Sequence, residues 1–86
     1  MIDEREAWKR VEDEAWRDEF HIAWIGASNP RAVMRTLNRH RAVMGEDHPA
    51  VRAITGHLAF LEGKSLGPSE ELLGEVMEQA YRLHLV

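Results

Sequence analysis

The prolines of this chain divide it into segments and limit its fold more than any other feature. Pro30, Pro49 and Pro68 are the only prolines among 86 residues. Each suits the first position of a helix, where a missing N–H costs nothing. A glycine lies four or five residues ahead of each proline, where a preceding helix would end in a left-handed cap. These glycines are Gly26, Gly45 and Gly63.

This spacing of prolines and glycines predicts an all-α fold, a compact bundle of four helices within one domain that spans residues 1–86. No stretch alternates apolar and polar residues for long enough to indicate a strand. We expect the first helix to be the longest. The predicted helices cover residues 4–25, 30–44, 49–62 and 68–84.

Composition excludes several classes of protein. The chain has no cysteine, which rules out disulfides, thiolate metal sites and thiol nucleophiles. No apolar run approaches the roughly 18 residues that cross a bilayer, and the acidic start lacks the basic and apolar parts of a secretion signal. We therefore expect a cytoplasmic protein with no membrane partner.

The sequence also lacks the motifs of common catalytic and metal sites. It contains no glycine-rich phosphate loop, no GxSxG and no HExxH. His48 follows Glu46 and Asp47, and these three side chains could hold a divalent ion loosely, but a solvated turn explains them equally. His57 shares a face with apolar residues, so we expect a core histidine bonded to a backbone carbonyl. We expect no enzyme activity, no cofactor and no metal.

Charge is distributed unevenly along the chain. Residues 28–45 carry four arginines without any Asp or Glu, whereas residues 1–27 hold eight acids against four bases. Residues 46–86 hold seven acids against three bases, and the whole chain has a net charge of −4. A basic helix between acidic ones can bind an anionic partner, or it can match acidic helices within the same molecule.

Helical phasing separates the arginines of the predicted helix 30–44 into two groups. At about 100° per residue, Arg31, Arg35, Asn38 and Arg39 share one exposed strip. Such a strip could rest on nucleic-acid phosphates, with the asparagine reading a base edge. The negative net charge and the lack of a second basic arm favour a protein with an acidic surface instead.

Arg41 differs from the other arginines because the same phasing places it inside the apolar face of its helix. Glu12 and Glu19 lie within the apolar face of the first helix. A buried arginine needs an anionic partner. We therefore predict a structural ion pair across the packed helices, between Arg41 and either Glu19 or Glu12.

The three tryptophans, Trp8, Trp16 and Trp24, all lie on the predicted first helix. Successive ones are about 80° apart around its axis, so they spread over a wide arc. One interpretation is that they fix this helix in the core. The other is that part of the arc stays exposed for a partner or a second copy, because tryptophan is favoured at interface hot spots.

Smaller features bear on the helix ends and on packing. His48 is a poor N-cap, which leaves Asp47 as the other candidate, and Gly67 is an acceptable cap for the last helix. Gly56, inside a helix, costs about 1 kcal/mol relative to alanine and predicts the close approach of another helix. The loop at 63–68 lies between two core helices; such loops can carry function, or can be a simple cap and turn.

Together these patterns favour a small accessory or regulatory helical protein that acts through protein–protein contact. The expected partner is another protein with an acidic surface, or a second copy of this chain in a homodimer. The alternative is a small helical nucleic-acid-binding regulator that uses the helix 30–44. The predicted contact residues are Arg31, Arg35, Asn38 and Arg39, together with the uncovered members of Trp8, Trp16 and Trp24.

Overall fold

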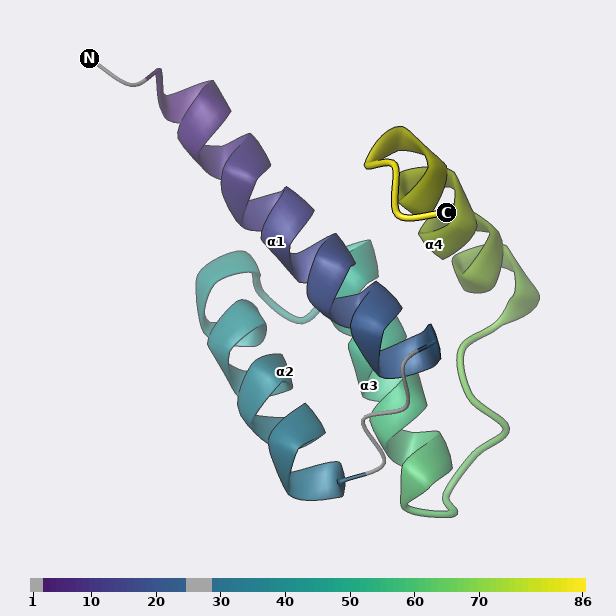
Figure 1. Ribbon diagram of the computed structural model, residues 1–86. Helices are drawn as coiled ribbons and strands as arrows, with labels where there is room; N and C mark the ends of the chain where they lie inside the picture. Colours follow the sequence, from purple (N-terminus) through teal and green to yellow (C-terminus); the bar gives the residue numbers. More distant parts are fainter. Residues whose placement is uncertain (1–2, 25–28) are drawn as a thin grey trace.

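The computed structural model describes residues 3–24 and 29–86, and within them it contains four helices and no strand. The helices pack against one another as a bundle (Figure 1). This confirms the all-α prediction, with the first helix the longest. No helix in the described residues combines the length and apolarity needed to cross a membrane. The helices are α1 (Glu4–Trp24), α2 (Pro30–Met44), α3 (Pro49–Leu61) and α4 (Glu70–Arg82).

Helices α2 and α3 begin at a proline, as the sequence predicts. The side-chain oxygen of Asn29 accepts the N–H of Arg31 at 3.0 Å, which satisfies one of the free donors of the first turn. His48 caps α3 with its ring, because its Nδ1 accepts the N–H of Ala50 at 3.1 Å. A histidine therefore takes the capping position for which Asp47 was the other candidate.

Helix α4 is shorter than predicted at both ends. It begins at Glu70 because the Ser69 hydroxyl accepts the N–H of Leu72 at 3.2 Å, so that serine, and not Gly67, is its N-cap. It ends at Arg82, two residues early, and His84 beyond it adopts a positive φ of 58°.

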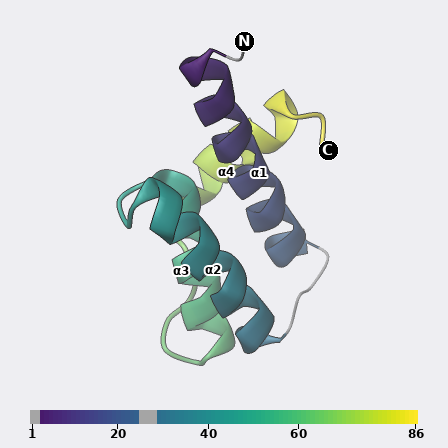
Figure 2. The same ribbon diagram turned by 90° about the vertical axis from the view of Figure 1, so that its left-hand side faces the viewer.

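Helix α3 is the centre of the bundle and packs against all three other helices. It lies beside α2 in both views of the molecule (Figures 1 and 2). On one side it packs against α2, where Val33 and Leu37 meet Val51, Ile54 and Leu58. On its other side Ala50 and Ala53 meet Ala15 and Trp16 of α1 and Leu72 and Val76 of α4.

The beginning of α1 extends beyond α2 and α3 (Figure 1). Every residue from 3 to 10 is exposed, and the buried positions of this helix start near its middle, at Ala15 and Trp16. Only the second half of α1 is therefore part of the core.

Gly56 permits a close approach, but not by a helix. A Cβ atom at this position would lie 2.9 Å from both Cγ and the backbone nitrogen of Pro68. The connection from α3 to α4 therefore presses directly on the backbone of α3, which corrects the prediction of a neighbouring helix.

Candidate partner-binding surface

Two carboxylates on α1 contact histidines that lie outside it. Oε2 of Glu12 lies 2.6 Å from Nε2 of His48, the residue that caps α3. Oδ2 of Asp18 lies 2.7 Å from Nε2 of His40, which is buried on α2. These contacts attach α1 to the first turn of α3 and to the second half of α2.

A third contact of this kind is the most deeply buried. Glu19 is fully buried, and its Oε1 lies 2.5 Å from Nε2 of His57 on α3. Among residues 3–24 and 29–86, no group has hydrogen-bond geometry with either carboxylate oxygen of Glu19 or with Nε2 of His57. The partner of this core histidine is thus a carboxylate and not the predicted backbone carbonyl.

These contacts correct the predicted ion pair of Arg41. Glu12 and Glu19 do lie on the inner side of α1, but histidines occupy the positions next to them. Arg41 instead donates a hydrogen bond to the side chain of Asn38, one turn earlier on the same helix. A long arginine side chain can cover apolar surface with its stem while its charged end stays near solvent, so phasing at Cα did not determine where the guanidinium lies.

The predicted basic strip of α2 divides into engaged and free residues. Arg39 donates to Oδ2 of Asp18 at 2.6 Å and lies 3.7 Å from Glu14. The side-chain oxygen of Asn38 accepts a hydrogen bond from Arg41. Arg31 and Arg35 are exposed, and neither has an ion-pair partner within residues 3–24 and 29–86.

A groove lies beside these two free arginines, between the first half of α2 and the end of α3, with a volume of about 700 Å³. We call it the α2–α3 groove. Pro30 and Met34 contribute apolar surface from α2, and the nearly buried Leu58 contributes it from α3. Sequence phasing predicted the arginines but not the groove, because a groove requires knowing which helix lies next to α2.

The charges around the α2–α3 groove are unequal on its two sides. Arg31 and Arg35 line it from α2, and Glu62 lines it from the end of α3. The Glu62 carboxylate lies 3.6 Å from Nζ of Lys64, which offsets part of its charge. The arrangement can therefore hold an apolar group next to an anion, provided that the anion lies on the α2 side.

The tryptophans of α1 do not form one surface. Trp16 is buried in the core, whereas Trp8 is 43% exposed on the projecting part of α1. The side chain of Trp24 lies outside the described part of the structure. Of the two indoles that are described, only Trp8 is accessible to a partner.

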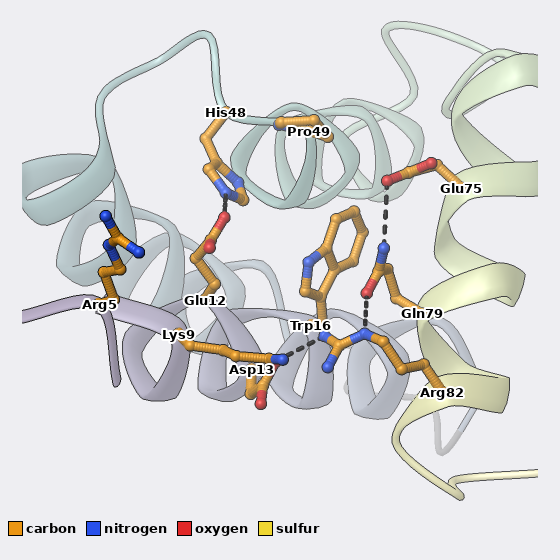
Figure 3. A pocket seen from close by; sticks show the side chains of 10 residues that line it. All are labelled: Arg5, Lys9, Glu12, Asp13, Trp16, His48, Pro49, Glu75, Gln79 and Arg82. Carbon is orange, nitrogen blue, oxygen red and sulfur yellow. Dashed lines mark hydrogen bonds and ion pairs between the residues drawn. The ribbon is translucent and has the colours of Figure 1, made fainter. Parts of the chain in front are cut away.

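A second hollow, of about 410 Å³, lies between α1, the start of α3 and α4, with Trp16 among its lining residues (Figure 3). Arg82 donates to Asp13 at 2.6 Å and to Gln79 at 2.7 Å. Gln79 in turn donates to Glu75 at 3.3 Å. The charged groups of this hollow mostly satisfy one another.

His48 borders the same hollow, where its ring contacts Glu12 (Figure 3). Its Nδ1 accepts a backbone N–H, so the ring proton is on Nε2, which donates to Glu12. Both ring nitrogens of His48 are therefore bonded within the molecule. In the described residues no group of three or more His, Cys, Asp or Glu side chains is arranged to hold a metal ion.

Comparisons of this chain with protein-family models, with curated proteins and with solved structures found no match.

Proposed function

We propose that this chain is a small accessory or regulatory protein that acts by contact with another protein, and that Arg31 and Arg35 bind an acidic surface of that partner. One observation carries the proposal. These neighbouring guanidinium groups are exposed and unpaired within the described residues, whereas Arg39 and Arg41 of the same helix have partners inside the molecule. Exposed charge of one sign steers association with a surface of opposite charge.

A protein partner suits this surface better than nucleic acid does. Affinity for nucleic acid comes from neutralising many phosphates with lysine and arginine, and only two arginines of the predicted strip are free. Asn38, which was expected to read a base edge, is bound to Arg41. Glu62 across the groove and the net charge of −4 would both repel a phosphate backbone.

The partner can also be a second copy of this chain, since α4 begins with the exposed acids Glu70 and Glu71. Sedimentation equilibrium tests this form of the proposal. If wild type is a dimer and the Arg31→Ala/Arg35→Ala variant is a monomer, the two arginines bind a second copy of this chain. A wild-type monomer over the whole concentration range would leave a different protein as the partner.

Affinity capture from extracts of the organism that encodes the chain tests the general proposal. Wild type is compared with Arg31→Ala/Arg35→Ala and with Arg10→Ala/Arg17→Ala, a control that removes the same charge from exposed positions of α1. We expect a protein that both wild type and the control retain and that the α2 variant loses. Equal retention by all three, or capture of nothing, would contradict the proposal.

Binding to heparin and to mixed-sequence DNA at about 50 mM salt tests the alternative. We expect no retention. Retention that weakens steeply as salt rises, and that disappears in the α2 variant, would replace the proposed protein contact with nucleic-acid binding.

A further inference from the structure

We infer that the α2–α3 groove binds a short peptide segment of the partner in which an apolar side chain stands next to acidic ones. This inference rests on the proposed function and specifies the chemistry that the partner must present. It adds two observations to the two free arginines, namely the apolar surface of the groove and the acid Glu62 on its opposite side.

The apolar surface of the groove consists of a buried residue at its base and an exposed residue on its α2 side. Leu58 is only 5% exposed and yet lines the groove, so it forms the floor, while Met34, at 38% exposure, remains accessible on the α2 side. Methionine adapts its shape to varied apolar partners. A volume of about 700 Å³ falls within the usual size of a ligand pocket, which leaves room for a leucine or an aromatic side chain.

The charges determine where the acidic residues of the peptide lie. Arg31 and Arg35 are four positions apart and therefore lie one above the other on the same face of α2. Arg31 lies in the first turn of α2, which contains no acid, so the helix dipole adds to its attraction for an anion. Glu62 disfavours acids on the opposite side.

The same asymmetry distinguishes a peptide from other anions. A phosphate backbone is charged along its whole length and has no apolar side chain for Met34 and Leu58. An amphipathic peptide can place its acids toward α2 and its apolar side chain in the groove. Both the charges and the apolar surface of the groove therefore favour an amphipathic acidic peptide.

Selection of random twelve-residue peptides from a display library on the intact protein tests the inference without assuming a partner. Selections are run on wild type, on Met34→Ser and on Val43→Ser, which removes an exposed apolar side chain from the other end of α2. A further pair, Arg31→Ala/Arg35→Ala and Arg10→Ala/Arg17→Ala, is run beside them. All these positions are exposed, and thermal melts confirm that each variant is folded.

We expect wild type and both controls to enrich peptides with a large apolar residue beside two or more acids. Binding of a synthetic peptide of this class, measured by fluorescence anisotropy, should weaken about fivefold or more in Met34→Ser and less than twofold in Val43→Ser. It should weaken about tenfold or more in the α2 arginine variant.

The outcomes separate the groove from the proposed function. Acidic peptides without an apolar preference, bound equally by Met34→Ser, would overturn the groove while leaving the acidic contact in place. Enrichment without acidic residues, or binding unaffected by the loss of Arg31 and Arg35, would overturn both. Preferential binding of an oligonucleotide by the wild-type protein would do the same.

Discussion

At the scale of single residues, the buried contact between Glu19 and His57 has the largest expected effect on stability. Helical phasing located Glu19 on the inner face of α1, and the structure places it there, fully buried. Phasing could not identify its partner, because that depends on which residue of α3 faces this point of α1. Arginine was the obvious cation, but an imidazole on the adjoining helix lies beside the carboxylate instead.

The Glu19–His57 contact predicts a large effect of a single substitution. His57→Ala should lower the free energy of unfolding by about 3–5 kcal/mol, because it removes the polar side chain that lies beside a fully buried carboxylate. Arg41→Ala should cost less than about 1 kcal/mol, since the partner of Arg41 is a neutral side chain on the same helix. Urea denaturation measures both.

Replacing both members provides the control. A Glu19→Leu/His57→Leu variant buries no charge there and should be about as stable as wild type, or more stable. If His57→Ala and Arg41→Ala both proved nearly neutral, the importance assigned to the buried contact would be contradicted.

Two glycines form a matched pair for a second prediction. Gly56→Ala should lower the melting temperature, because the new methyl group would lie 2.9 Å from the backbone of Pro68. Gly74→Ala should raise the free energy of unfolding by about 0.5–1 kcal/mol, since it lies inside α4 with open space around it. Thermal melts that moved in the same direction for both variants would contradict the packing described for Gly56.

At the scale of elements, prolines located the starts of two helices correctly but not the start of a third. The starts of α2 and α3 follow directly from Pro30 and Pro49. The start of α4 did not follow from Pro68, because Ser69 is the better cap and begins the helix after the proline. Proline tolerates the first helical position but does not require it, so the local hydrogen bond decided the boundary.

His48 joins two elements, because one ring caps α3 and contacts Glu12 of α1. His48→Asn should keep the cap and lose the link to α1, whereas His48→Ala should lose both. We expect the alanine variant to be less stable than the asparagine variant by about 1 kcal/mol, the usual value of an N-cap. Equal stability of the two in chemical denaturation would show that the ring does not act as the cap.

At the scale of the whole molecule, the acids of α1 contact part of the basic surface of α2. Acidic side chains of α1 contact Arg39 and His40. The basic helix thus pairs in part with an acidic helix of the same molecule, which was one of the two alternatives that the charge distribution of the sequence left open. Arg31 and Arg35 remain outside this match. The sequence alone could identify the basic segment, but only the packing of α1 on α2 divides it into structural and free parts.

Binding of an acidic polypeptide at Arg31 and Arg35 can be measured by titrating the isotope-labelled protein with soluble polyglutamate and recording amide ¹H–¹⁵N spectra. The probe is a flexible acidic polypeptide, and the protein offers it eleven lysine and arginine side chains. We expect the shifted resonances to cluster at residues 29–35 and near Leu58, and we expect Arg31→Ala/Arg35→Ala to remove the shifts. Shifts spread over the basic residues of α1, or no shifts at about 50 mM salt, would contradict this expectation.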